Sequence, residues 1–218
     1  MPFDLSPIFA KYEELQKEVD AIFNKVKTLE SSCVTCKKGC NDCCHATFDL
    51  SFIESIYINT MFEKTFDYGP IRSSILEKAN KIDRDLTKLK KDLYYAEKNG
   101  EQTEEIMKKA AKIRIKCPLL DDNNLCVLYE YRPITCRLYG IPTEIAGQAH
   151  VCGYSGFKKG QNYPTVHLDK IHAKLDEMSL AIGKHVKSKF TKLDEVYVPL
   201  SMALLTNYDD RYLGIENK

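Results

Sequence analysis

The chain has 218 residues, a length that fits one domain, or one domain with an appended segment. Hydrophobic residues make up 44% and charged residues 29% of the sequence, which excludes a disordered, collagen-like or mucin-like protein. The net charge of +1 gives no general attraction to nucleic acid or acidic membranes. The sequence shows no apolar run long enough for a membrane span and no signal peptide, so we expect a cytoplasmic protein.

The nine cysteines are the most informative feature of the composition. The cytosol keeps thiols reduced, so a cysteine-rich cytosolic protein more often binds a metal or uses its thiols chemically than forms disulfides. A chain of this length also does not need disulfides for stability. We therefore expect metal chemistry at these cysteines, with a disulfide framework as the alternative.

The hydrophobic pattern predicts that the chain begins with a long helix. Apolar residues alternate spacings of four and three from Ile8 to Leu29, which is typical of one face of a helix over about residues 6–29. The segment from Cys33 to Cys44 breaks this periodicity and predicts an irregular loop.

A second helix is indicated by its amino-terminal signal. Ser51 followed by Glu54 is typical of a capping box, and the apolar positions that follow predict a helix that ends near Phe66.

The next segment predicts a helical hairpin. The four-three spacing returns from Ile75 to Leu93 and stops at Asn99, which is followed by glycine. A shorter amphipathic piece follows this turn directly. We therefore expect residues 71–116 to form an antiparallel helical hairpin that projects as an arm or a lid.

Residues 117–164 predict a second irregular loop, because they hold four cysteines and several prolines without strong periodicity. Within it we expect a helical turn at residues 127–131 and a short extended piece at residues 137–141. A bound metal would organise so long a loop. A last amphipathic helix over residues 168–182 and a turn over residues 199–205 complete the chain.

The expected architecture is a single metal-binding domain over residues 1–218. It is mostly α, a helical bundle with a helical hairpin arm and two irregular cysteine-rich metal-binding loops. The apolar stripes of the long helices indicate packing within the bundle, with the seam of a coiled-coil homodimer as the alternative.

The cysteines fall into two blocks, Cys33-x2-Cys36-x3-Cys40-x2-Cys43-Cys44 and Cys117-x8-Cys126-x9-Cys136-x15-Cys152. Two-residue spacers let two sulfurs face one metal while backbone amides point at the thiolates. Thiolate ligands select zinc or an iron–sulfur cluster rather than magnesium or calcium. In extended backbone the adjacent Cys43 and Cys44 would point to opposite sides, so one of them serves a second metal or none.

Four segments of these blocks carry a family resemblance: Cys36-Lys-Lys-Gly-Cys40-Asn-Asp-Cys43-Cys44, Cys117-Pro-Leu-Leu, Cys126-Val-Leu-Tyr129 and Arg132-Pro-Ile-Thr-Cys136-Arg137-Leu-Tyr139. They resemble the YkgJ-type cysteine-cluster family, which is described as zinc- or iron-chelating. The resemblance leaves most of the helices unmatched, and the arm is longer than the family needs. It implies eight metal ligands, with Cys33 as an extra cysteine: Cys36, Cys40, Cys43, Cys44, Cys117, Cys126, Cys136 and Cys152.

The resemblance favours a 4Fe-4S iron–sulfur cluster, and zinc in two closed four-thiolate sites is the alternative. A four-thiolate site of either kind keeps a formal charge of about minus two, so we expect cations nearby. Arg132 and Arg137 are the candidate cofactor-binding residues. We expect them to fix the loop against the cluster or to bind an anionic ligand. Further candidate cations are Lys37, Lys38 and Lys116, and the histidines that could replace a thiolate are His45 and His150.

These features predict a metal-binding protein that holds an iron–sulfur cluster or zinc through two cysteine-rich loops. Some proteins with the resembling domain methylate lysines of flagellin, so a cluster-dependent protein-modifying enzyme is the first alternative. A thiol redox switch through Cys43 and Cys44 is the second. No catalytic residue can be assigned. We expect a partner protein and no membrane association, and the sequence gives no clear signal for nucleic-acid binding.

Overall fold

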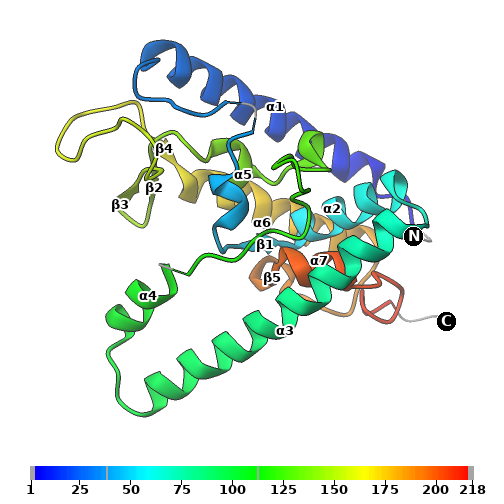
Figure 1. Cartoon of the computed structure of the whole chain (residues 1–218). Coiled ribbons are helices and arrows are strands. Elements are labelled where there is room, and N and C mark those ends of the chain that lie inside the picture. Colours follow the sequence, from blue (N-terminus) through cyan, green and yellow to red (C-terminus); the bar gives the residue numbers. More distant parts are fainter. Residues whose placement is uncertain (1–2, 38, 112, 216–218) are drawn as a thin grey trace.

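The computed structural model describes residues 3–37, 39–111 and 113–215. As the sequence predicts, the protein is mostly helical, with 54% of its residues in helices. The α-helices, which Figure 1 shows in chain order, are α1 (Ser6–Leu29), α2 (Phe52–Thr65), α3 (Pro70–Lys98), α4 (Thr103–Ala111), α5 (Ile134–Leu138), α6 (Leu168–His185) and α7 (Leu200–Leu205).

The first two helices have the bounds that the pattern predicts. The structure contains the predicted capping box: the Ser51 hydroxyl donates a hydrogen bond to Glu54 Oε2 at 2.9 Å, and the Ser51 backbone N–H donates to the same atom at 3.2 Å. Glu54 also accepts a hydrogen bond from the Tyr12 hydroxyl of α1 at 3.3 Å. The capping carboxylate therefore joins the first two helices in the core.

Two small sheets, which the sequence did not predict, connect distant parts of the chain. The strands β1 (Asp49–Ser51) and β5 (Tyr197–Pro199) pair antiparallel. In the second sheet, β2 (Thr143–Ile145) pairs antiparallel with β3 (Gln148–His150) and parallel with β4 (Val166–His167). Strands of two or three residues are too short to leave an alternating pattern in the sequence.

The prediction of an extended piece at residues 137–141 is wrong at its start. The α-helix α5 includes Arg137 and Leu138, and the chain becomes extended only at Tyr139. Pro133 has a φ of −59° and directly precedes this helix. A proline at the start of a helix lacks only an N–H that the first turn leaves unpaired, so it favours a short helix that is too brief to show periodicity.

The buried apolar residues form two cores. The main core lies among α1, α2, α5 and α6 and includes Tyr12 and Ile182, both at most 1% exposed. The second core lies among α2, α3 and α7 and includes Phe62, Ala79 and Ala203, each fully buried. Helix α2 contributes to both cores and connects the two halves of the molecule.

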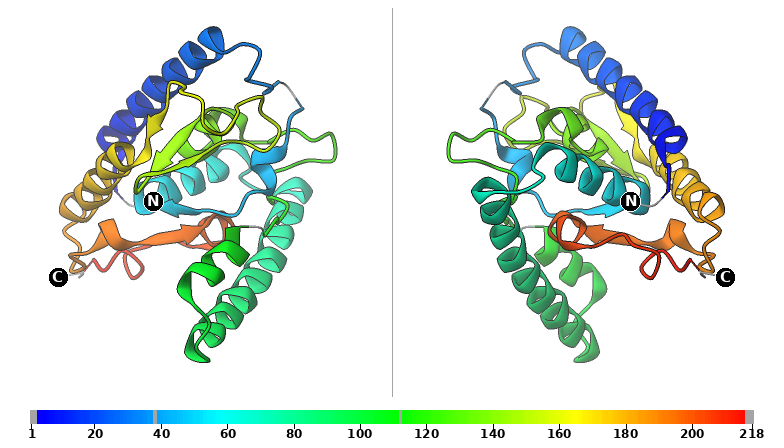
Figure 2. Two further views of the ribbon diagram at one scale, coloured as in Figure 1. Left: turned by 90° about the vertical axis from the view of Figure 1, so that its left-hand side faces the viewer. Right: turned by 90° about the vertical axis from the view of Figure 1, so that its right-hand side faces the viewer.

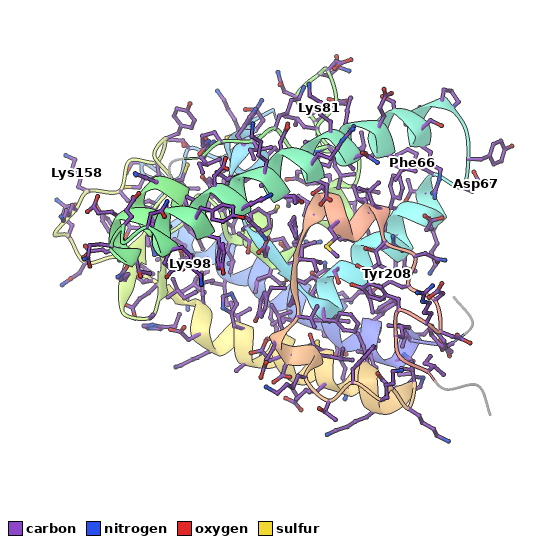
Figure 3. The ribbon with its side chains drawn as sticks, turned by 90° about the horizontal axis from the view of Figure 1, so that it is seen from below. Phe66, Asp67, Lys81, Lys98, Lys158 and Tyr208 are labelled. Atoms are coloured by element: carbon purple, nitrogen blue, oxygen red, sulfur yellow. The ribbon has the colours of Figure 1, made fainter. Side chains whose placement is uncertain are left out.

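We use the term "the arm" for α3 and α4, residues 70–111. Figures 1 and 2 show α4 beside the distal part of α3, where both helices extend away from the other elements. Figure 3 views α3 from below, with the labelled Phe66 near its beginning and Lys98 at its end. The apolar stripe of α3 is buried near its start, at Ile75 and Ala79, and only partly buried from Ile82 onwards. The distal stripe therefore does not pack in either core.

Within the described residues, the structure contains no helix with the length and apolarity that crossing a membrane requires.

Candidate metal centre

The adjacent cysteines Cys43 and Cys44 lie on a short 3-10 helix, Asp42–His45. The expectation that they point to opposite sides of an extended backbone is therefore wrong, because the backbone turns at this point. The Cys44 thiol forms a hydrogen bond with the Cys43 sulfur. The two sulfurs therefore lie next to each other.

The backbone joins the two cysteine blocks directly. The Cys117 N–H donates a hydrogen bond to the Cys44 carbonyl oxygen at 2.7 Å, and the Ile115 N–H donates to the His45 carbonyl oxygen at 3.0 Å. An isolated antiparallel bridge pairs Ala46 with Arg114. The segment that follows the arm thus runs alongside the first cysteine loop.

The remaining cysteines of the second block reach the same place by different routes. Cys126 lies opposite Leu120 in an isolated bridge, which folds residues 120–126 into a tight loop. Cys136 lies on α5, whose first N–H, that of Ile134, donates to Glu54 Oε1 at 2.9 Å. The capping residue of α2 therefore also positions the helix that carries Cys136.

Five of the eight predicted ligands line one cavity of about 250 Å³. Its remaining wall is largely apolar and includes residues of the arm. We call the five the cavity thiols: Cys43, Cys44, Cys117, Cys126 and Cys136.

Burial controls the protonation of most cavity thiols. It raises the pKa of Cys117 to about 12, and it raises the pKa of Cys126 and of Cys136 as well. The negative charge of Cys43 adds to the increase at all three, so these thiols lie near one another. Without a cation these buried thiols keep their protons at neutral pH.

The adjacent pair behaves differently from the other cavity thiols. The hydrogen bond from the Cys44 thiol lowers the pKa of Cys43 to about 7, and the positive charge of Arg132 acts in the same direction. The same hydrogen bond and burial raise the pKa of Cys44. The pair thus holds one proton and one negative charge near neutral pH, which favours the approach of a cation.

The other three predicted ligands form a second group, which we call the Cys36 group: Cys36, Cys40 and Cys152. Burial raises the pKa of Cys36 to about 11, and the charges of Cys40, Cys152 and Cys43 add to this increase. Cys43 therefore lies close to both groups of thiols. The Cys36 sulfur donates to the Tyr139 carbonyl oxygen at 3.5 Å and lies against Gly140, whose φ is +106°.

Asp42 is a functional candidate that the sequence reasoning missed. It is 8% exposed and accepts a hydrogen bond from the Cys152 sulfur at 3.3 Å. It also forms an ion pair with Arg114, the residue that bridges the first cysteine loop. An acidic residue within the Cys40-Asn-Asp-Cys43 motif is the only signal that the sequence offered.

The two predicted cofactor-binding arginines have different surroundings. Arg132 lines the cavity and stacks on Tyr129, with 3.6 Å between its guanidinium carbon and the ring centroid. Arg137 is buried, and its three guanidinium nitrogens donate to the carbonyl oxygens of Arg132 and Glu130 and to the carboxylate of Asp20. Arg132 therefore faces the thiols, whereas Arg137 holds the surrounding loop.

The structure also places the other candidates. Lys116 lines the cavity, Lys37 is exposed, and Lys38 lies outside the described residues. His45 Nδ1 is hydrogen-bonded to the Asn41 carbonyl oxygen at 3.0 Å, and His150 is exposed on β3. Neither histidine lines the cavity.

Cys33 lies at the edge of the main core, where its carbonyl oxygen accepts a hydrogen bond from the Gly156 N–H at 2.7 Å. In the described part of the chain, no three histidine, cysteine, aspartate or glutamate side chains are arranged so that they could chelate one metal ion as they stand. All nine cysteines are free thiols.

Comparison with known families gives one match. A family model named CxxCxxCC, described as "Putative zinc- or iron-chelating domain", matches residues 35–153. The matched segment includes all eight predicted ligands and leaves out Cys33. No curated protein and no solved structure matches the chain.

Proposed function

We propose that this chain, which belongs to the CxxCxxCC family of zinc- or iron-chelating domains, holds an iron–sulfur cluster of the 4Fe-4S type among its cavity thiols. Metal binding follows from membership of the family. The choice of a cluster over a zinc ion is our proposal. The observation that carries it is the cavity beside the five thiols.

The donor set fits an iron–sulfur cluster. Five thiols line the cavity, and the one carboxylate among its described lining residues, Asp49, is paired with Lys90 at 3.1 Å. All-thiolate coordination is typical of iron–sulfur clusters and of structural zinc. A calcium or magnesium site would require several oxygen ligands, which this cavity does not supply.

The space beside the thiols favours a cluster over a single ion. Four thiolates around zinc stand at about 2.3 Å from one centre and leave no room between them. Here the five thiols form part of the wall of a cavity of about 250 Å³, whereas one water molecule needs about 10–15 Å³ on the same measure. A group of eight atoms fits in the part of this cavity next to the thiols, and the part towards the arm stays open beside it.

The charges around the cavity suit a bound anionic cluster. Arg132 and Lys116 line the cavity, and neither forms an ion pair with a described residue. Their two positive charges match the formal charge of about minus two of a four-thiolate site in its oxidised form. In this proposal Arg132 acts on the cluster directly, and Arg137 keeps the loop of Arg132 in place.

The grouping of the thiols suggests how eight ligands divide. We assign the cluster to Cys44, Cys117, Cys126 and Cys136. Cys43, which acts electrostatically on Cys36, then joins the Cys36 group as its fourth thiol. That second group would hold a second metal, and iron or zinc both suit its ligands.

Visible absorption of protein purified without oxygen tests the proposal. An iron–sulfur cluster gives a broad sulfur-to-iron absorption that a reductant bleaches, whereas zinc thiolates are colourless. Under the proposal Cys136→Ser abolishes this absorption and Cys33→Ser retains it. A colourless native protein that contains stoichiometric zinc would overturn the proposal.

An enzyme that uses the cluster to modify a partner protein is the second candidate. A structural site has every metal position filled by the protein, whereas an enzyme needs a space beside the metal. The apolar part of the cavity provides such a space. Addition of candidate protein substrates would test this function.

A homodimer formed through the distal arm is the remaining alternative for the apolar stripes of the long helices. The mass of the protein in solution would test it.

A further inference from the structure

We infer that the part of the cavity between the arm and the cavity thiols is a binding site for a small, uncharged, apolar molecule. The uncharged character rests on the proposed function, because it follows from the charge of a bound cluster. The apolar character rests on the protein alone. Nothing in the proposed metal chemistry requires this site.

The lining of this part of the cavity is apolar on both sides. Residues of α3 that contribute to it follow helical spacing and include Ile82, Leu86, Leu89 and Leu93. From Ile82 to Leu93 the helix covers roughly 16 Å. The opposite side includes aliphatic and aromatic residues of the body: Phe48, Ile58, Leu128 and Leu200.

Ordinary core packing does not account for this space. Protein interiors are close-packed, and voids larger than a water molecule are few. The four apolar residues of distal α3 are only partly buried, although they face other apolar groups across the cavity. A ligand that covered this apolar surface would remove it from water, which favours binding.

Polar contacts attach α3 to the body of the protein beside the cavity. Lys90 of α3 forms an ion pair with Asp49 at 3.1 Å, and Asp83 of α3 accepts a hydrogen bond from the Ser201 hydroxyl at 3.3 Å. These contacts fix α3 to β1 and α7 beside the cavity, so the position of the arm relative to the thiols is set by the protein. A site that is formed before binding suits a small organic ligand.

The charge balance selects the kind of ligand. With a cluster bound, the charges of Arg132 and Lys116 are already balanced, and an anionic ligand would meet the negative cluster. A cationic ligand would have to compete with these two side chains. An uncharged molecule is therefore the one that the cavity accepts beside the metal.

Two related probes test the inference. Phenylnaphthylamine is uncharged, and anilinonaphthalene sulfonate carries the same rings with one negative charge. We expect metal-loaded protein to bind phenylnaphthylamine saturably in equilibrium dialysis, at least tenfold more tightly than the sulfonate. Protein without metal should bind the sulfonate more tightly than metal-loaded protein does, because Arg132 and Lys116 are then unbalanced.

Three variants locate the binding. Ala110→Phe narrows the cavity from α4 and Leu89→Gln makes its wall polar, and either change should weaken phenylnaphthylamine binding about tenfold. Leu29→Gln is the control, because Leu29 is 60% exposed on α1 and outside the cavity. If Ala110→Phe does not fold, Leu89→Gln still decides the question.

The inference would be overturned if phenylnaphthylamine did not bind, or if all three variants bound it as tightly as the native protein does. Its failure is distinct from failure of the proposed function, which is read from metal content. If metal-free protein still binds phenylnaphthylamine, the apolar site exists whether or not the protein holds a cluster. If metal-loaded protein binds the two probes equally tightly, only the claim that the ligand is uncharged is overturned.

Discussion

The backbone N–H of Cys117 donates a hydrogen bond to the carbonyl oxygen of Cys44 at 2.7 Å. This contact connects the first residue of the second loop with the adjacent cysteine pair of the first loop. Metal bound by both blocks would therefore stabilise a junction that the backbone already forms. Because binding to a site that exists only in the folded state adds to folding free energy, metal content and stability should change together.

Cys136→Ser is expected to lower metal content and thermal stability together. Cys136 lies on α5 in the cavity, and loss of one ligand weakens the metal that connects the two blocks. Loss of about 3 kcal/mol would lower Tm by roughly 6–12 °C in a chain of this size. Elemental analysis and thermal unfolding monitored by circular dichroism would measure both effects.

Cys36→Ser is expected to act in the same direction as Cys136→Ser, and Cys33→Ser is the control that should retain the metal. Unchanged metal content in both Cys36→Ser and Cys136→Ser would contradict a site built from the two loops.

The long helices could be predicted because their apolar stripes repeat over many turns. The capping box of Ser51 and Glu54 was likewise a local signal, and the structure contains it. The five-residue helix α5 and the short strands were missed because elements of this length carry no period. Sequence position, moreover, does not reveal which face of a helix meets a cavity, so the half-buried distal stripe of α3 could not be predicted.

The sequence also did not predict how the thiols divide into the cavity thiols and the Cys36 group. Cys152 is far from Cys36 in the chain, and the fold alone brings its charge close to that of Cys36. Within the loop that we expected there, a 3-10 turn at Cys43 and Cys44 brings the two sulfurs next to each other. The spacing of the cysteines predicted metal binding, whereas the contacts among them depend on tertiary structure.

Gly140→Ala is expected to disturb the Cys36 group. Gly140 has a φ of +106°, and a Cβ at this position would collide with the Cys36 sulfur. Gly100→Ala is the matched control, because Gly100 has a φ of +91° and nothing lies within 4 Å of a Cβ built there. The control should lose about 1–2 kcal/mol through backbone strain. We expect a larger loss for Gly140→Ala, together with lower metal content.

Urea unfolding of both glycine variants would provide the comparison. Equal destabilisation of the two, with metal content unchanged, would show that the Cys36 sulfur does not depend on the space at Gly140.

Asp42→Asn is expected to destabilise the protein by about 1–2 kcal/mol. Asp42 is buried and accepts from Cys152 while it pairs with Arg114, so the change leaves the Arg114 charge without its partner. Arg114 is itself partly exposed, with 43% of its side chain accessible, which moderates the effect. Chemical denaturation gives the free energy of unfolding.

Glu18→Gln provides the control for Asp42→Asn. It removes an ion pair with Lys174 whose two side chains are more than half exposed, and such a pair contributes less than about 1 kcal/mol. A loss for Asp42→Asn no greater than that of Glu18→Gln would mean that Asp42 is not a structural support of the thiols.

Stability is expected to fall in alkaline solution through buried tyrosines. Burial raises the pKa of Tyr57, and the hydrogen bond from its hydroxyl to Glu13 acts in the same direction. The unfolded chain releases the phenol proton near pH 10, whereas the folded protein retains it to higher pH. The stabilising contribution is therefore complete below about pH 10 and is lost as the pH rises towards the folded pKa.

Tyr57→Phe should flatten this decline when urea unfolding is compared between about pH 9 and 12. Tyr94→Phe, a change at a tyrosine that is 53% exposed on the arm, should leave the slope as it is in the native protein. Equal slopes for all three proteins would exclude Tyr57 as a source of the pH dependence.

The amounts of iron, acid-labile sulfide and zinc per chain, in protein purified without oxygen, test the central claim most directly. The cavity beside the five thiols predicts about four iron and about four sulfide in the cluster. A further metal ion in the Cys36 group would add to this content without adding sulfide. About two zinc per chain with no sulfide would contradict the account, because closed zinc sites would then hold the two loops and the cavity would contain no cluster.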